Sequence, residues 1–543
     1  MAKRRSAKRK MSGPAPATQQ KPRTLPLGFQ LGVTTLILLI YGFFLAHQAD
    51  LTKGDLGRHL KNGQLFVQQL SIPTHNLYSY TYPDYPFVNH HWGSGVVFYL
   101  VEAIAGFPGL TLFFIVLSLL TLWLFFDAAV RYASFAVAAP LALFVIPVLI
   151  TRHEVRPEVF SYFLGGLFLQ LLLGYRYGRL GERWLFCLPL LQIFWVNLHI
   201  YFFVGFVLVG VFFVESAIGV VLKKDREELV RLKPLALALS LTALAACLNP
   251  SGFTGAIYPF LILKGYEVPV IENYSVAAVL REGIPFLPFP YFAIVFGLLC
   301  LSWLYVAVKA PKTLSVANLL LSCFFSLFAW WAIRNFAFFA YFALPLTAIN
   351  LKNLFGSKGR SSSSPSTLKL AAALVAIAVV LVLINPVYLL SSGRGPRGVG
   401  LEEGNTAAAE FFIKENLQGP IYNNYDVGAY LIYFLYPSHR VFIDNRPEAY
   451  PTAFFTDVYL PLHLDEQKWQ SVSEAYGFNV LFFNHRDRSS WGEQFMIRRL
   501  LDPAWAAVYF DKSVLILLRR NGPNQATIAK FELPKEKILQ QPN

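Results

Sequence analysis

The stretch GFQLGVTTLILLIYGFFLAHQADLTKGDLGRHLKNGQ (28–64) joins an apolar run directly to a charged segment. Residues 28–46 carry no charged side chain, and their length is close to the roughly 20 residues that a helix needs to cross a bilayer. The segment GDLGRHLKNGQ (54–64) then presents an acid, two bases and a histidine. The stretch therefore predicts a membrane span that ends in a loop with unusual chemistry.

The rest of the chain extends this apolar pattern. Of its 543 residues 55% are hydrophobic and 15% are charged, which is too apolar for a water-soluble protein of this size. Runs of roughly 16–23 apolar residues recur over the first 390 positions and predict a polytopic α-helical membrane protein. The formal net charge of +15 lies in the amino-terminal tail and in short loops, a pattern typical of membrane orientation rather than of nucleic-acid binding.

Charge placement predicts the orientation of the chain. The tail 1–27 holds eight Lys or Arg and no acid, and the run after it is long for a signal peptide and lacks a convincing cleavage site. We therefore expect an uncleaved first span with a cytoplasmic tail. The basic loops 176–183, 223–233, 309–312 and 352–369 belong on the same side by the positive-inside rule.

The number of membrane crossings decides whether segment 92–105 is a span. The loops at Asp55 and Arg156 are both expected outside, so an even number of spans must separate them, yet three apolar pieces lie between. The first piece, 92–105, is short and carries Glu102, so we place it in the membrane interface. About eleven spans result, near 28–46, 108–129, 135–150, 158–174, 184–198, 200–221, 234–248, 286–308, 313–332, 335–351 and 370–390.

The carboxyl-terminal part has a different character. Residues 391–400 form a Gly-rich linker, and 401–543 alternate helix-like pieces with strand-like pieces such as PIYNN, HRVFIDN, FNVLFFN and SVLILLRR. This pattern predicts a small soluble α/β domain. Together with a membrane domain over 28–390 and an external loop over 47–107, it predicts a protein of the inner (cytoplasmic) membrane whose carboxyl-terminal domain is extracytoplasmic.

The cysteines suggest neither a disulfide framework nor a zinc site. Cys187, Cys247, Cys300 and Cys323 all lie within apolar runs. The sequence indicates no cofactor and no metal site, although it leaves a divalent cation open.

Many polar side chains are expected at the external ends of the spans. Ionisable groups at membrane depth are costly and usually mark a functional cavity. The group comprises Asp55, Arg58, His59, His90, His91, Arg152, His153, Glu154, Arg156, Glu158, Asn197, His199, Asn249, Glu272 and Arg334.

Several members also have a structural interpretation. Asp55 and His59 could belong to a solvated interfacial helix, and Arg156 could reach lipid headgroups. Asn197 and His199 could be a satisfied hydrogen-bonding pair, while the two histidines before Trp92 could anchor the interface. The case for function is that all of them share one side. A carboxylate such as Asp55 can take a proton from a hydroxyl, and Arg156 and Arg334 offer planar forks for a phosphate.

An ordered series of motifs resembles the bacterial branch of the GT-C glycosyltransferases, which includes the protein O-mannosyltransferases and the lipid A aminoarabinose transferase. The motifs are DLGRHLKNG (55–63), SIPTHNLYSYT (71–81), VNHHW (88–92), RPE (156–158), WVNLH (195–199) and LNPSG (248–252). The stretches NNYDVGAY (423–430) and VFIDNRPEAY (441–450) are similar to the external domain of uncharacterised members. The resemblance implies an integral membrane enzyme that transfers a sugar, with inversion, from a polyprenyl-phosphate donor to a glycan, lipid or protein acceptor.

The resemblance also implies roles for particular residues. An acid in the first external loop is the catalytic base of the superfamily, and Asp55 is the matching position. Relatives often have His-Glu-Trp where this chain has His90-His91-Trp92, so a second acid is missing there. Glu102 or Glu154 could supply it, one acid could suffice, or activity could be altered or lost.

The remaining candidates are less specific. His59, His90 and His91 are further acid or base candidates, and Arg58 joins Arg156 and Arg334 as a candidate for the donor phosphate. Asn197, His199, Asn249 and Glu272 are candidates for a polar pocket. In the carboxyl-terminal domain Asp426, Asp444 and Arg446 could bind sugar, but Asp426 could also cap a helix, and Asp444 and Arg446 could pair with each other.

Three other functions stay open. An envelope oligosaccharide ligase or polymerase would also gather arginines and histidines outside. A transporter or lipid flippase would be expected to show an internal repeat with polar groups near mid-membrane, and we find no such repeat. A receptor would use its soluble domain to bind a ligand.

Overall fold

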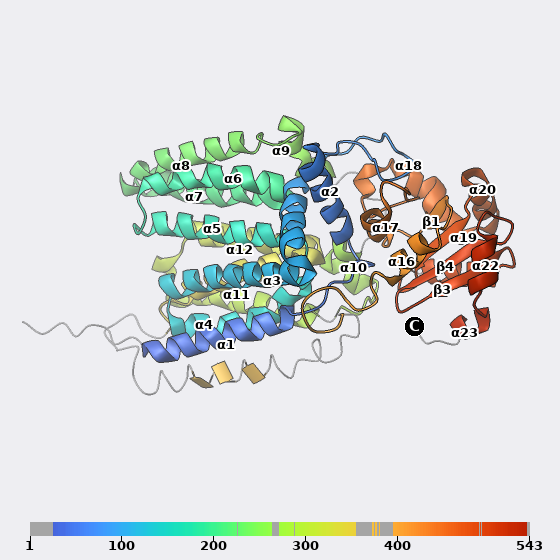
Figure 1. Cartoon of the computed structure of the whole chain (residues 1–543). Coiled ribbons are helices and arrows are strands. Elements are labelled where there is room, and N and C mark those ends of the chain that lie inside the picture. Colours follow the sequence, from blue (N-terminus) through green and yellow to red (C-terminus); the bar gives the residue numbers. More distant parts are fainter. Residues whose placement is uncertain are drawn as a thin grey trace, which may run out of the picture.

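A computed structural model describes residues 25–262 except 225, 271–354 except 287, short pieces within 372–380, and 395–539 except 488 and 490. The chain forms a bundle of helices with a mixed α/β domain packed against one end of it (Figure 1). We call that end of the bundle the domain end.

The bundle contains the first thirteen α-helices. They are α1 (Leu27–Leu45), α2 (Leu56–Gln69), α3 (Trp92–Tyr132), α4 (Phe135–Leu149), α5 (Glu158–Arg176), α6 (Cys187–Leu198), α7 (Phe203–Lys223), α8 (Arg226–Ala245), α9 (Gly252–Leu261), α10 (Val276–Arg281), α11 (Phe289–Lys309), α12 (Val316–Trp331) and α13 (Phe336–Asn350). Short 3-10 turns precede or follow several of them at the domain end: η1 (Ile150–Arg152), η3 (Ile200–Phe202), η5 (Ile271–Asn273) and η7 (Ile333–Asn335).

Six helical segments of the described chain are long and apolar enough to cross a membrane. They are Leu27–Leu45, Trp92–Tyr132, Phe135–Arg152, Glu158–Arg176, Ile200–Leu222 and Phe289–Lys309. The helices α6, α12 and α13 match further expected spans but are shorter. The total of about eleven stays a prediction, and most of the last expected span, 370–390, lies outside the described residues.

Helix α3 bends where the sequence separates an interfacial segment from a span. Gly106 has φ 64 and non-helical geometry, and Pro108 follows it without a backbone N–H. Figure 1 shows the first part of α3 running across the end of the bundle beside α2, whereas the second part runs along the bundle. The bend therefore places 92–105 across the direction of the other helices, as expected for an interfacial segment.

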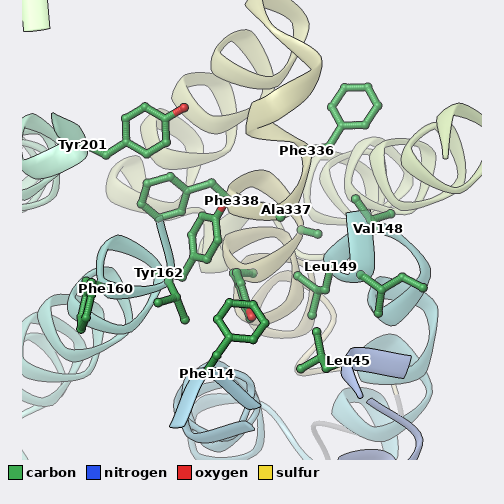
Figure 2. Packing of buried hydrophobic residues seen from close by; sticks show 14 of the residues in the cluster. Leu45, Phe114, Val148, Leu149, Phe160, Tyr162, Tyr201, Phe336, Ala337 and Phe338 are labelled. Atoms are coloured by element: carbon green, nitrogen blue, oxygen red, sulfur yellow. The ribbon is translucent and has the colours of Figure 1, made fainter. Parts of the chain in front are cut away.

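Helix α13 is the centre of the bundle. All of its 15 residues are buried, which suits a helix that is apolar on every side. Phe114 of α3, Leu149 of α4 and Tyr162 of α5 converge on its first turns (Figure 2). This packing fixes the loops at the domain end, because α4, α5 and α13 all begin or end there.

The carboxyl-terminal domain is built around a four-stranded mixed sheet. The strand order is β1-β2-β4-β3, in which β1 pairs parallel to β2 and the other pairs are antiparallel. The strands are β1 (Ile421–Asn423), β2 (Val480–Asn484), β3 (Trp505–Phe510) and β4 (Val514–Arg519). The helices are α16 (Ala407–Lys414), α17 (Gly428–Leu435), α18 (Thr452–Phe454), the π-helix η9 (Phe455–Tyr459), α19 (Leu460–Leu464), α20 (Glu466–Tyr476), α21 (Gly492–Leu501), α22 (Gln525–Phe531) and α23 (Lys535–Leu539).

Three of the four strand-like pieces lie in this sheet, and the fourth does not. The segment HRVFIDN forms a single bridge from Val441 to Ser79 in the loop that follows α2, instead of pairing with β1 or β2. The strand prediction for it is therefore wrong, because its backbone groups bond to the first loop of the bundle rather than to the domain's own sheet.

The two faces of the sheet bury different clusters. Alternate residues such as Ile421 and Phe482 belong to the cluster that runs on into the bundle, whereas Tyr422 and Phe483 belong to a separate aromatic cluster beneath α19 to α21. Because one apolar cluster is continuous from bundle to domain, the domain packs against the bundle as part of the same core.

Candidate active site

Helix α2 lies between the bundle and the carboxyl-terminal domain. Its first half is buried, with Arg58 at 5% and His59 at 0% exposure. Two close approaches make this possible: a Cβ on Gly57 would overlap the carbonyl of Ala429 in α17, and one on Gly63 would overlap the carbonyl of Gly95 in α3. The interpretation of α2 as a solvated interfacial helix is therefore wrong.

Asp55 stands at the amino-terminal end of α2 but does not cap it. Its side chain accepts no bond from the first-turn N–H groups, although an aspartate in this position commonly does. Instead Oδ2 accepts a hydrogen bond from His59 Nε2 at 3.1 Å and a longer one from Arg58 at 3.4 Å. Oδ1 is buried without a hydrogen-bond partner in the described structure. One oxygen is thus held by the protein and the other is available for a further donor.

The surroundings keep Asp55 ionised. Burial alone would raise the pKa of Asp55, but the charge of His59, the hydrogen bond from His59 and the charges of Arg156 and Arg58 hold it well below its usual range. Burial and the charge of Arg58 lower the pKa of His59, whereas Asp55 acts in the opposite direction. The His59 Nε2–H is therefore donated to a charged carboxylate.

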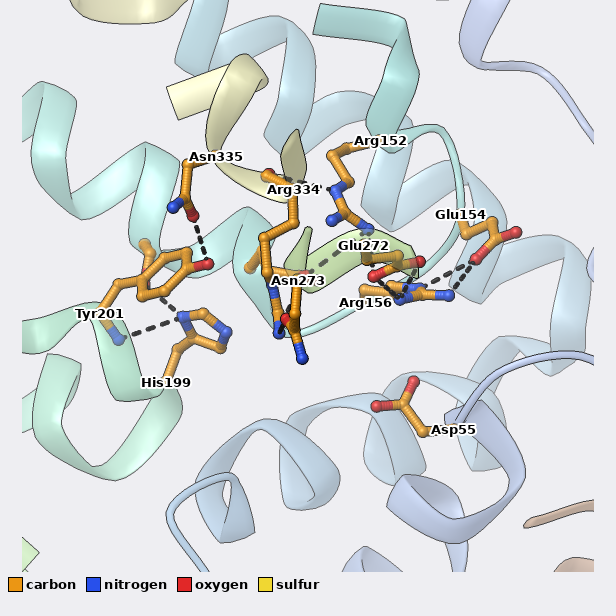
Figure 3. Close-up of polar contacts among 12 residues, drawn as sticks. Asp55, Arg152, Glu154, Arg156, His199, Tyr201, Glu272, Asn273, Arg334 and Asn335 are labelled. Carbon is orange, nitrogen blue, oxygen red and sulfur yellow. Dashed lines mark hydrogen bonds and ion pairs between the residues drawn. The ribbon is translucent and has the colours of Figure 1, made fainter. Parts of the chain in front are cut away.

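Beside Asp55 lies an ion-pair cluster. Figure 3 shows five of its members, Arg152, Glu154, Arg156, Glu272 and Arg334, and the sixth is Glu158, which pairs with Arg152 and Arg334. Arg156 bonds Glu154 at 2.8 Å and both oxygens of Glu272 at 3.2 Å. Arg152 bonds Glu272 at 3.0 Å and lies 4.0 Å from Glu158. Arg334 bonds Glu158 at 3.4 Å and the side chain of Asn273 at 3.1 Å.

The cluster is assembled from three loops at the domain end. The turn η1 and the residues before α5 supply Arg152, Glu154 and Arg156, the first residue of α5 is Glu158, η5 supplies Glu272, and η7 supplies Arg334. Arg156 also reaches towards Asp55, because its guanidinium would lie 3.4 Å from a Cβ on Gly54. The idea that Arg156 merely reaches headgroups is therefore wrong.

Charges balance across the site. Arg58 and the three arginines of the cluster face Asp55 and the three glutamates of the cluster. Glu272 is 37% exposed, whereas Glu158 is 6% exposed. Burial would raise the pKa of Glu272, but Arg152, Arg156 and Arg334 hold it below the usual range, so it stays charged. An incoming anion could therefore replace the Glu272 carboxylate more easily than the buried one.

Two cavities meet at this cluster. The first is a partly open pocket of about 630 Å³, open solvent included, and is lined by Asp55, Lys53, His153, Glu154 and Arg156, among others. The second, about 270 Å³ by the same measure, extends from Arg152, Arg156 and Glu158 to the aromatic side chains of Tyr41, Phe114, Tyr162 and Tyr341. Phe114, Glu154 and Arg156 line both cavities. The site thus has a polar side next to Asp55 and a side that leads into the apolar bundle.

Four histidines are grouped next to Asp55, with His91 in the middle. The ring of His91 lies 5.4 Å from that of His59, 5.0 Å from that of His199 and 3.9 Å from that of His90. His199 Nδ1 is in turn hydrogen-bonded to Ser161 Oγ at 2.8 Å. Among the described residues, no group of three or more His, Cys, Asp or Glu side chains is arranged to hold a metal ion.

Three of the candidate residues have structural contacts instead. Asn249 bonds the carbonyls of its own turn, at Ala246 and Gly252. Asn197 accepts from Trp92 and donates to the carbonyl of Leu248, so it joins α3, α6 and the segment before α9. The hydrogen bond of Glu102 goes to Tyr433 of α17 rather than to the cluster.

The three candidate sugar-binding residues of the carboxyl-terminal domain have different surroundings. Asp444 and Arg446 pair with each other at 2.7 Å and are at most 1% exposed, so they are not available to bind sugar. Asp426 lies within electrostatic range of the cluster: burial and the neighbouring Asp487 raise the pKa of Asp426 to about 7, while Arg156 acts in the opposite direction. Asp426 is therefore an acid from the domain that shares the electrostatic surroundings of Asp55.

Sequence reasoning missed two features. The sequence placed Glu158 at this end of the spans but not its pairing with Arg334, and it did not single out Asn273, which also bonds Arg334. An ion-pair group also exists at the far end of the bundle, where Arg176 bonds Glu215 at 2.7 Å and Glu228 at 3.3 Å. This far group is a compact link between α5, α7 and α8.

Solved membrane-protein structures share this fold. ArnT from Cupriavidus metallidurans, solved with undecaprenyl phosphate, matches with a TM-score of 0.54 over 93% of this chain and 99% of its own, at 13% identity. The apo oligosaccharyltransferase of Archaeoglobus fulgidus matches with a TM-score of 0.56 over 89% and 73%, at 12% identity. AglB from the same organism, in complex with an inhibitory peptide and a dolichol-phosphate, gives 0.54 over 92% and 77%, also at 12%. No family model and no curated protein matches the sequence. The likeness confirms the expected fold, that of a polytopic integral membrane protein.

Proposed function

We propose that this chain, which has the fold of the GT-C glycosyltransferases, transfers a sugar from a polyprenyl-phosphate donor to a hydroxyl acceptor with inversion at the anomeric carbon. One observation carries the proposal. An ionised carboxylate with one unpartnered oxygen lines the same cavity as Arg156, and that cavity shares walls with one that leads into the apolar bundle. Such a site suits a reaction between a lipid phosphate and a polar acceptor.

The proposed reaction uses the two sides of the site differently. The acceptor hydroxyl lies in the polar cavity and donates its hydrogen bond to Asp55 Oδ1. Its oxygen attacks the anomeric carbon as the bond to the phosphate oxygen breaks, and the bonding electrons leave with the phosphate. Asp55 takes the hydroxyl proton, so the products are a glycoside and a polyprenyl phosphate.

The arginines of the ion-pair cluster suit the leaving phosphate. The guanidinium group of arginine binds two phosphate oxygens in a bidentate manner. Preorganised hydrogen-bond donors also stabilise the negative charge that develops on the leaving group. In the present structure the Glu272 carboxylate accepts hydrogen bonds from both Arg152 and Arg156. The donor phosphate therefore replaces Glu272, which bonds both arginines and is more exposed than Glu158, and keeps the site close to neutral.

The fold of the neighbours supports the donor class. ArnT was solved with undecaprenyl phosphate, and AglB with a dolichol-phosphate. We propose a position in the inner membrane with the domain end facing outside, which would give the site access to lipid-linked sugars and envelope acceptors. A ligase that uses a pyrophosphate-linked glycan is the second candidate, because AglB shares the fold.

Binding of undecaprenyl phosphate to the purified full-length protein tests the donor site. We expect Arg156→Gln to weaken binding at least tenfold, because it removes a guanidinium that no other group replaces; tenfold corresponds to about 1.4 kcal/mol. Glu272→Gln should tighten binding several-fold, because the phosphate no longer displaces a charge. Arg520→Gln and Glu532→Gln remove an exposed surface pair and serve as matched controls. Equal affinity in Arg156→Gln and wild type would contradict the assignment.

A further inference from the structure

The segment DNRPEAY (444–450) lies close to Asp55, and the proposed reaction leaves its role unexplained. Asn445 is the contact between them. Its Nδ2 donates to the carbonyl oxygen of Gly54 at 2.6 Å, and its Oδ1 accepts from Arg58 Nε at 3.4 Å. Gly54 immediately precedes Asp55, and Arg58 bonds the Asp55 carboxylate. One side chain of the carboxyl-terminal domain, Asn445, thus contacts both the residue before the proposed base and the arginine that bonds its carboxylate.

The bond to Gly54 controls the direction in which α2 begins. Gly54 has φ 70, in the left-handed region that favours glycine, so the chain turns sharply just before Asp55. The carbonyl held by Asn445 belongs to the peptide unit that contains the Asp55 nitrogen. Fixing that unit fixes the backbone from which the Asp55 side chain projects, and Asp55 has no capping bond to its own helix that could do so.

The turn that carries Asn445 is rigid. The residues before and after Asn445, Asp444 and Arg446, form a bidentate ion pair with each other. Arg446 also donates a hydrogen bond to Asn76 Oδ1 at 2.6 Å. Tyr450 Oη donates to Asp444 Oδ2 at 2.9 Å. Asn423 at the end of β1 bonds the carbonyl of Ile443 at 2.7 Å. The buried pair therefore holds the turn, and the turn presents Asn445 to Gly54.

We propose that Asn445 is a positioning residue for Asp55, through which the carboxyl-terminal domain holds the carboxylate at the cavity. The proposal rests on the proposed function for its consequence in catalysis, but the contact itself can be tested without it. The proposal gives the carboxyl-terminal domain a role other than ligand binding. Without the hydrogen bond from Asn445 to the Gly54 carbonyl, Asp55 is no longer held at the cavity.

The test measures how tightly Asp55 is held and how fast sugar is transferred. Full-length wild type, Asn445→Ala, Asn445→Asp and Asn479→Ala are purified in detergent and treated with a water-soluble carbodiimide and glycine ethyl ester, and labelling of Asp55 is followed by mass spectrometry. Asn479 is the matched control, because its amide bonds the Gly419 carbonyl at 2.8 Å within the same domain. Transfer is compared in cells from the amount of sugar on envelope glycans at equal protein level.

We expect Asp55 to be labelled several-fold faster in Asn445→Ala than in wild type or Asn479→Ala, with transfer at least tenfold lower. Asn445→Asp should behave like Asn445→Ala, because its carboxylate still accepts from Arg58 but cannot donate to Gly54. Wild-type labelling in both Asn445 variants would overturn the inference whatever the activity. Altered labelling with unchanged transfer, together with full activity of Asp55→Asn, would instead contradict the proposed function and leave the contact established.

Discussion

At the scale of single residues, the site depends on which oxygen of Asp55 is occupied. His59 and Arg58 share Oδ2, and Oδ1 is left for an acceptor hydroxyl. The hydrogen bond from His59 fixes the orientation of the carboxylate, while the neighbouring positive charges keep it ionised. The carboxylate is thus ready to accept a proton without first losing one.

The lowered pKa of Asp55 predicts how activity depends on pH. Because the pKa is depressed, the carboxylate persists below the usual aspartate range near 4, and activity should fall only as the pH drops through the lowered value. Arg58→Leu removes one of the charges that lower the pKa, so the midpoint of this acid limb should rise, by about one pH unit at most. Arg58→Lys keeps the charge and should leave the midpoint near that of wild type. The pH dependence of transfer in isolated membranes measures this, and an unshifted midpoint in Arg58→Leu would show that Asp55 ionisation does not limit the rate.

At the scale of the helices, the site depends on the close packing of α2. Two glycines let it approach α3 and α17, and a longer side chain at either position would overlap a backbone carbonyl that cannot move independently. The position of Asp55 is therefore set by the seating of a whole helix between two parts of the molecule.

Gly63→Ala tests this seating. Its Cβ would overlap the Gly95 carbonyl, so we expect a lower thermal unfolding temperature in detergent and reduced transfer. The matched control is Gly210→Ala in α7, where a Cβ would meet nothing within 4 Å. Alanine in an open helical position stabilises by up to about 1 kcal/mol, so the control should be as stable as wild type or slightly more stable. Equal stability of the two variants would mean that α2 has room to move.

At the scale of the whole molecule, bundle and domain enclose the first loop together. Leu51 N donates to Asn405 Oδ1 at 3.0 Å, and Asn484 Nδ2 donates to the Thr52 carbonyl at 2.8 Å, so the backbone before Asp55 is bonded to the domain at several points. A connecting segment of a membrane protein usually lies exposed at the surface. Here the polar loop is interior.

Hydrogen exchange of the full-length protein should show this enclosure. We expect the amides of residues 49–60 to exchange slowly, at rates close to those of buried helix α13, because backbone groups bonded to the domain open only when the interface opens. Residues 281–286, a largely exposed turn, should exchange faster by orders of magnitude. Rapid exchange at 49–60 would mean that the domain does not hold the loop.

The sequence predicted the fold class, the separation of segment 92–105 from the span that follows it, and three of the four strands of the carboxyl-terminal sheet, because apolar length and the alternation of side chains are local signals. It also brought Asp55, Arg58, His59, Arg156, Glu272 and Arg334 to one end by counting crossings. It could not predict that Glu272 pairs with Arg152 and Arg156 or that Asn445 bonds the carbonyl of Gly54. Those contacts join positions more than one hundred residues apart in the sequence and depend on packing alone.

The central claim is that Asp55 is the base of a lipid-phosphate-dependent glycosyltransferase. The most direct measurement compares lipid-linked sugars and envelope glycans by mass spectrometry in cells that lack the protein and are complemented with wild type or Asp55→Asn, at equal expression and membrane insertion. We predict that wild type alone restores a missing sugar, and that a polyprenyl-phosphate sugar accumulates with Asp55→Asn. Full complementation by Asp55→Asn would contradict the account and favour a transport or binding role.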